Sequence, residues 1–184
     1  MTTTKTKPEP PANAVARDPH WTATRERLRN RQRPILTMTI CDDTDVKARY
    51  DSAVYTERRA RAAAELEPDD IDLAKALKAA ESELAAAREA FDAVAIVLRF
   101  QALPRADFEA LKKEHPASEE QTEDGLAFNI DTFGPALVAA SSLDGISEEE
   151  ATEYLETWAA GEADQLFSTA WNVQGETRAD LGKG

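Results

Sequence analysis

The stretch Val94–Pro116 constrains the fold more than any other part of the sequence. Between residues 94 and 101 apolar side chains occupy every second position, which is the period of a strand with one buried face. From Pro104 the period becomes helical, with Phe108 and Leu111 following at i+4 and i+7 on one face. A strand that passes directly into an amphipathic helix joins two layers of a fold, so the flanking segments are predicted to form two modules.

The segment before this stretch opens with a second predicted strand. Ile35–Cys41 alternates apolar side chains with threonines, and Cys41 is interpreted as a small core residue at the end of the strand. Asp42–Asp45 then offers N-cap residues for a helix that runs to about Glu65, and Pro68 interrupts the helical pattern. The order strand, helix, break is therefore expected here.

A second helix follows the break and carries a heptad pattern. After an N-cap at Asp69 or Asp70, its apolar positions advance by alternating steps of four and three: Leu73, Leu77, Ala80, Leu84, Ala87 and Phe91. Two helices joined by a tight turn are expected to form an antiparallel hairpin, which returns the chain so that strands 35–41 and 94–101 pair antiparallel. The heptad positions are expected to pack within the chain, with self-association through Leu73–Phe91 as the alternative.

Residues 104–175 predict an acidic helical domain. Asp131 is the predicted N-cap of one helix, whose first turn would hold Pro135. Ser147 and Glu150 match the capping box S-x-x-E at the start of a further amphipathic helix. Ala117–Asp124, between the helix that begins at Pro104 and the helix capped by Asp131, is predicted to be a loop.

These patterns together predict an α+β fold that is predominantly α. A two-stranded antiparallel sheet closes a long helical hairpin, and a small bundle of about four short helices follows. The predicted divisions are a disordered basic arm over residues 1–33, a strand-helix-helix-strand module over 34–103, an acidic helical domain over 104–175 and a flexible tail over 176–184.

The net charge is −13, but its sign changes along the chain. Residues 1–33 carry eight basic and three acidic side chains, whereas residues 104–184 carry five basic and eighteen acidic ones. In Arg25–Arg33 arginine occupies every second position, which favours a solvated arm that contacts an acidic surface, with nucleic-acid binding as the alternative. The acidic remainder repels nucleic acid and favours cationic partners.

The sequence lacks the residue sets that catalysis and metal binding require. His20 and His115 are the two histidines and Cys41 is the single cysteine, so neither a Ser-His-Asp or Cys-His site nor a thiolate cluster is expected. The glycines match no phosphate-binding spacing. We therefore expect no enzyme, no cofactor and no metal site.

No apolar run approaches the ~20 residues that cross a bilayer, and the N-terminal residues lack the apolar centre of a signal peptide. The expectation is a cytosolic protein without a membrane segment.

Large aromatic side chains are frequent in the acidic half of the chain. A bundle this small can bury only some of them fully, so the others are expected to line an acid-rimmed groove for a basic amphipathic segment of a partner. The candidates are Phe128, Phe133, Tyr154, Trp158, Phe167 and Trp171; for each of them a place in the core is the first expectation and the groove is the alternative.

Three stretches resemble tail assembly chaperones of long-tailed, siphovirus-type phages that infect actinobacteria: RFQALPRADFEALKKEHP, GLAFNIDTFGPALVAAS and EADQLFSTAWNVQ. The resemblance covers about residues 35–173 and rests on structural motifs. It implies a non-catalytic protein of the host cytoplasm that coats the aggregation-prone tape measure protein and keeps it soluble during tail morphogenesis.

Two other function classes are kept as alternatives. A structural component of the virion, such as a tail or head-tail adaptor protein, would use the heptad and a strand edge for ordered assembly. An acidic mimic of nucleic acid would need regularly spaced surface carboxylates, whereas the acids here cluster at predicted helix starts and loops.

Overall fold

The computed structural model describes residues 19–123 and 125–177, and the chain divides between Arg33 and Pro34 into two compact units. The first unit contains helix α2 (Pro19–Arg29), which lies in the segment that composition predicts to be a disordered arm. Proline stands at its first position, no glycine or proline follows within it, and Arg27 and Arg29 in the last turn suit the helix dipole. Local helix propensity thus favours a helix over residues 19–29, where low hydrophobicity predicts disorder. The rest of the predicted arm before it, residues 1–18, lies outside the described part of the chain.

The second unit is organised around a two-stranded antiparallel sheet of β1 (Ile35–Ile40) and β2 (Ile96–Gln101), paired with Met38 opposite Leu98. The predicted antiparallel pairing is confirmed. The predicted start of the second strand at Val94 is wrong: the Ala95 N–H donates to the Phe91 carbonyl at 2.9 Å, so Val94 still belongs to the preceding helix. Cys41 follows β1 and is half-buried.

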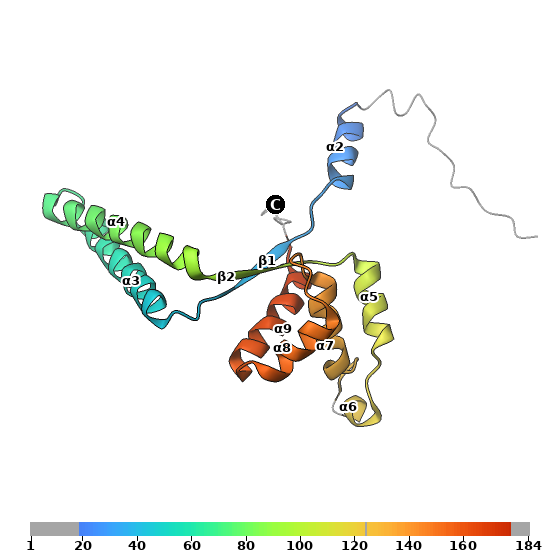
Figure 1. Cartoon of the computed structure of the whole chain (residues 1–184). Coiled ribbons are helices and arrows are strands. Elements are labelled where there is room, and N and C mark those ends of the chain that lie inside the picture. Colours follow the sequence, from blue (N-terminus) through green and yellow to red (C-terminus); the bar gives the residue numbers. More distant parts are fainter. Residues whose placement is uncertain (1–18, 124, 178–184) are drawn as a thin grey trace, which may run out of the picture. The chain divides into compact units, whose positions relative to one another are not determined.

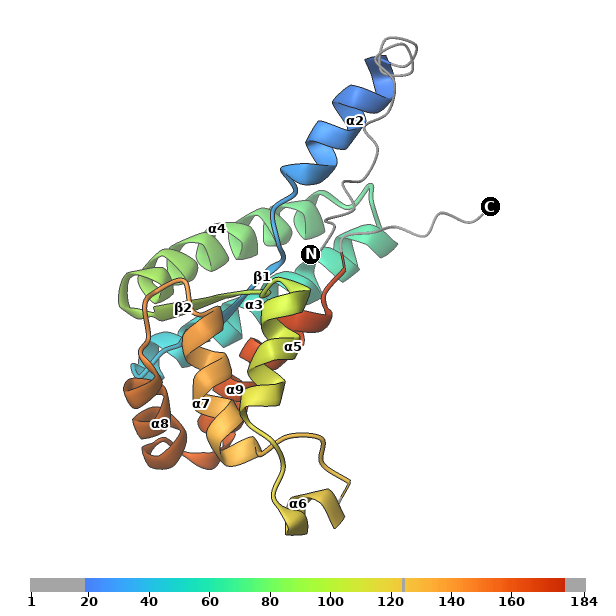
Figure 2. The same cartoon turned by 90° about the vertical axis from the view of Figure 1, so that its right-hand side faces the viewer.

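Helices α3 (Thr44–Leu66) and α4 (Ile71–Val94) form the predicted hairpin and run side by side in Figures 1 and 2. The carboxylates of Asp43 and Asp70 cap them by accepting two backbone N–H groups each. The six heptad residues of α4 are its least exposed side chains, so their packing within the chain is confirmed. In the described part of the chain, neither hairpin helix contacts any helix or strand except its partner.

The remaining helices are α5 (Arg105–Glu114), α6 (Glu119–Glu123), α7 (Ile130–Ser141), α8 (Glu148–Thr157) and α9 (Ala160–Gly175). The short helix α6 occupies part of the predicted loop 117–124. Helix α7 is central, since it packs on α5, α8, α9 and β2, and α9 packs on both strands. The sheet and the helices therefore share one core, in which Met38, Phe100, Phe133, Leu137 and Leu166 are buried, and no boundary between compact units falls near residue 103.

Two helix starts in this region were predicted. The capping box of α8 is confirmed, because Glu150 N–H donates to Ser147 Oγ at 3.2 Å and Ser147 N–H donates to Glu150 Oε2 at 2.8 Å. The N-cap of α7 is Asn129 and not Asp131, whose N–H donates to the Asn129 side chain at 3.0 Å. Pro135 consequently lies beyond the first turn, where it is buried.

The fold is consistent with the predicted class, an α+β structure that is predominantly α. The outer edge of β2 is covered at Arg99 by the chain itself: Leu143 N–H donates to the Arg99 carbonyl at 2.8 Å and Arg99 N–H donates to Asp144 Oδ2 at 2.7 Å. The Arg99 guanidinium also donates to Asp144 Oδ1, through Nη2 at 2.6 Å. These bonds hold the pKa of Asp144 below, and that of Arg99 above, its ordinary value.

Candidate functional site

The most specific surface feature of the acidic half is a cleft of about 340 Å³ formed by α7, α8 and α9, which we term the acidic cleft. Its apolar part consists of Ile130, Gly134, Pro135, Leu155, Ala163 and Phe167, and its polar part of Asp131, Thr152, Glu156 and Asp164. Three helices thus place carboxylates around an apolar surface.

Gly134 leaves room in the acidic cleft. A β-carbon at this position would lie 3.6 Å from both Leu155 Cδ1 and Phe167 Cδ2, so any longer side chain would project into the space between α8 and α9. Gly134 also precedes Pro135, and a residue with a β-carbon is disfavoured in helical conformation before proline. The same residue therefore lets α7 continue as a helix and keeps the cleft open.

The acidic cleft is uncompensated by positive charge. None of its lining residues is basic, and the carboxylates of Glu156 and Asp164 form no hydrogen bond or ion pair with any residue in the described ranges. The Asp131 carboxylate receives one bond, from Gln121 Nε2 at 3.4 Å. Ile130 stands at the cleft with 42% of its surface exposed. The site therefore combines exposed apolar surface with a negative potential, which suits a segment that is apolar on one face and basic at its margins.

A cluster of aromatic rings lies beside this region, on α5, α7, α9 and the residues before α7. Phe133 is fully buried at its centre, with ring centroids 4.4 Å from Phe128, 6.2 Å from Phe108 and 6.1 Å from Trp171. Trp171 is 36% exposed and, with Phe108, lines a second cleft of about 240 Å³. The cluster stabilises the fold and presents one indole at the surface.

The six aromatic candidates from the sequence do not line one common groove. Phe133 is core, Phe167 lines the acidic cleft, and Phe128 packs with Trp171 in the aromatic cluster. Tyr154 and Trp158 stack on each other with centroids 4.8 Å apart, and both are half-buried against the core. The sequence patterns did not single out Ile130 and Leu155 as lining residues. A glycine inside a helical pattern, Gly134, is a signal that could have indicated this place.

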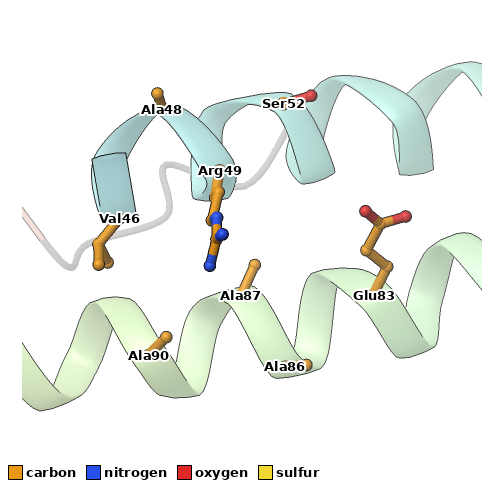
Figure 3. Close-up of a pocket in the computed structure, with 8 residues that line it drawn as sticks. All are labelled: Val46, Ala48, Arg49, Ser52, Glu83, Ala86, Ala87 and Ala90. Carbon is orange, nitrogen blue, oxygen red and sulfur yellow. The ribbon is translucent and has the colours of Figure 1, made fainter. Parts of the chain in front are cut away.

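The hairpin carries a larger groove of about 570 Å³, shown in Figure 3. Its lining is mostly small, with Ala86, Ala87 and Ala90 on α4 and Ala48 and Ser52 on α3.

Two charged side chains reach into this groove. Arg49 of α3 points toward α4 and Glu83 of α4 points toward α3 (Figure 3), so the groove carries one charge of each sign. It lacks the excess of negative charge that distinguishes the acidic cleft.

His115 is held in structural contacts. His115 Nδ1 lies 3.0 Å from Thr132 Oγ1, and its ring packs edge-on against Phe133. Within residues 19–123 and 125–177, no group of histidine, cysteine and acidic side chains is arranged to hold a metal ion. None of the helices in those ranges combines the length and the apolar character needed to span a membrane.

Comparison of the chain with protein-family models, with curated proteins and with solved structures gives no match.

Proposed function

We propose that this protein is a non-catalytic tail assembly chaperone that binds amphipathic helical segments of a phage tape measure protein in the acidic cleft and keeps that protein soluble in the host cytoplasm. The observation that carries the proposal is the acidic cleft itself, because it joins Ile130, Leu155 and Phe167 to a rim of three carboxylates. The sequence resemblance over about residues 35–173 supports the same function.

The geometry favours a helix as the bound segment. The cleft is formed between helices, and an amphipathic helix can lay one or two apolar side chains against Leu155 and Phe167 while its basic residues meet Glu156 and Asp164. A tape measure protein offers many such segments in sequence, so weak contacts repeated along it raise the overall avidity. The net charge of −13 would then keep the coated assembly soluble by mutual repulsion.

The test is co-expression with the cognate tape measure protein, followed by co-purification of the soluble fraction. We expect the wild-type chain to keep the tape measure protein soluble. The double variant Glu156→Lys, Asp164→Lys replaces attraction with repulsion at the rim and should weaken binding roughly tenfold. Equal insolubility of the tape measure protein with and without the wild-type chain would refute the chaperone function.

Glu153→Lys serves as the matched control for a single reversal, because Glu153 lies on the same helix, is exposed and does not line the cleft. It should leave binding within about twofold of wild type. If Glu153→Lys weakens binding as much as Glu156→Lys, then net charge and not the acidic cleft determines the interaction.

The alternative of a structural virion protein is supported by one observation, the outer edge of β1, whose backbone groups bond to no residue in the described ranges. Mass spectrometry of purified phage particles distinguishes the two functions. A chaperone should be absent from the particles, whereas a structural component should be present in a fixed ratio to the tube protein.

A further inference from the structure

The two edges of the small sheet differ. On β2, Arg99 directs its N–H and carbonyl away from β1, and Asp144 and Leu143 bond to them. On β1, the Pro34 carbonyl accepts from Ala102 N–H. The backbone N–H and carbonyl groups at even positions of β1 therefore point toward β2, and those at odd positions point to the outer edge of the sheet. The backbone N–H and carbonyl groups of Ile35, Thr37 and Thr39 therefore line the outer edge, and no residue within 19–123 and 125–177 bonds to them.

The β1 edge also lacks the devices by which proteins protect such edges. Its sequence, Ile-Leu-Thr-Met-Thr-Ile, contains no charged residue and no proline, and it pairs with β2 in an unbroken register without a bulge. The side chains of Ile35, Thr37 and Thr39 are exposed on one face of the sheet. Val97, next to them on β2, is 48% exposed. Within the described ranges, the chain thus covers its sheet at Arg99 of β2 and leaves the β1 edge ready to accept a strand.

From this contrast we infer that the β1 edge pairs antiparallel with the β1 edge of a second copy of this chain, which joins the two sheets into one of four strands. An alignment that places Thr37 opposite Thr37 of the second copy also places Ile35 opposite Thr39 and uses all three outward residues. Each such pair exchanges two backbone bonds, giving about six in total. No like charges meet at the three pairs.

Charge at the two ends of the strand selects the second copy and the antiparallel direction. Arg31 and Arg33 precede β1, and Asp42 and Asp43 follow it. Antiparallel pairing centred on Thr37 brings the basic end of one copy to the acidic end of the other, at both ends of the joint sheet. Parallel pairing would place like charges together. Since a strand pair buries less than the ~1,200 Å² of a standard interface, the expected dimer forms at high concentration and dissociates on dilution.

The test is sedimentation velocity of the full chain over a range of concentrations, without any partner protein, so it is independent of the proposed chaperone function. Wild type should shift from monomer to dimer with concentration. Thr37→Lys and Thr37→Glu should each weaken dimerisation at least tenfold. An equal mixture of the two should restore it, because the introduced lysine of one variant then faces the introduced glutamate of the other. Val97→Lys is the matched control, with the same charge on the same face but on β2, and should dimerise like wild type.

A cross-link provides the second measurement in case the charged variants alter folding. In the background Cys41→Ser, Thr37→Cys places two cysteines opposite each other, at a Cα separation of about 5.5 Å that a disulfide can bridge. Mild oxidation should link these chains into dimers much faster than Val97→Cys in the same background. The proposal would be overturned if the wild-type chain stays monomeric at all concentrations, if the mixture of the Thr37→Lys and Thr37→Glu chains does not dimerise, or if cross-linking is equal at both positions. Dimerisation that survives every Thr37 variant would also overturn it and would assign the interface to another surface, such as the hairpin.

Discussion

Leu166→Ala tests whether α9 is seated on the sheet. Leu166 is fully buried, on the inner face of α9 with Ala163, Ala170 and Val173. Replacing leucine with alanine removes three carbon atoms from this core, which costs about 2.4 kcal/mol at roughly 0.8 kcal/mol for each buried methylene. The cavity that remains adds to this cost, so we expect the free energy of unfolding to fall by about 3–4 kcal/mol.

The assay is urea denaturation followed by far-ultraviolet circular dichroism. With a denaturant dependence of about 2 kcal/mol per molar urea, the midpoint should fall by roughly 1.5–2 M with little change in slope. Leu66→Ala is the control, because Leu66 is also helical but 83% exposed, and it should change stability by no more than about 0.5 kcal/mol. A loss below about 1 kcal/mol for Leu166→Ala would refute the packing of α9 on β1 and β2.

The same variant should show that the hairpin opens separately. Neither α3 nor α4 contacts another helix or strand of the described ranges, so their local opening is expected to cost less than global unfolding. Hydrogen exchange should therefore be faster in α7 and α9 of Leu166→Ala, with hairpin amides unchanged from wild type. Equal acceleration in the hairpin would mean that it unfolds only together with the core.

Three further predictions concern a cap, an ion pair and the aromatic cluster. Ser147→Ala should lower stability by about 1 kcal/mol in thermal melts, whereas Ser147→Asp, which keeps an N-cap acceptor, should lose much less; equal losses would contradict the capping role. Because bonds from Arg99 lower the pKa of Asp144, the contribution of this carboxylate is complete above its unfolded pKa of about 4 and disappears as pH falls through the lower folded value. The stability difference between wild type and Asp144→Asn should thus be largest at neutral pH and shrink in acid, and a gap in urea midpoints that does not vary with pH would exclude the ion pair as its source. Phe133→Ala should cost about 3–5 kcal/mol and Trp171→Ala clearly less, since Phe133 is fully buried and Trp171 lies at the surface; the reverse order in thermal melts would show that the cluster is centred on the indole.

The hairpin and the strand pairing could be predicted because their signals are local and mutually consistent. Asp43 and Asp70 are strong capping residues directly before helical patterns, and Pro68 allows neither helix to continue. The heptad of α4 requires an apolar partner surface, which α3 supplies. Since the two helices run antiparallel, the strands at their ends meet, as the sheet shows.

The predicted ends of helices and strands were wrong where two sequence patterns overlap, or where contacts with residues distant in the sequence determine the helix start. At Val94 the strand alternation and the end of the heptad helix coincide, and the helical bonds extend to Ala95. At the start of α7, both Asn129 and Asp131 suit an N-cap. Asn129 takes the position where its N–H donates to the His115 carbonyl at 2.9 Å and its side chain accepts from Gln121, contacts that no local pattern predicts.

The acidic cleft was foreseeable in kind but not in detail. Charge and aromatic content predict an acid-rimmed apolar surface, yet Phe133 and Phe167, which are both helical, have different roles in the structure. The difference arises because Phe133 lies in the core and Phe167 lies at the cleft, although α7 and α9 both contribute residues to the core and to the cleft. Only the packing of three helices determines which aromatic ring is left at the cleft.

The length of the α3–α4 hairpin can change, in evolution or by design, independently of the rest of the fold. The chain leaves the sheet at Ile40 and re-enters it opposite, at Ile96, so equal insertions into α3 and α4 leave that pair in register. Steps of about seven residues in each helix would also preserve the apolar seam. The turn at Glu67–Asp70 is accordingly suited to carry an inserted tag or binding segment as a spacer of chosen length, without disturbing the core formed by the sheet and α7–α9.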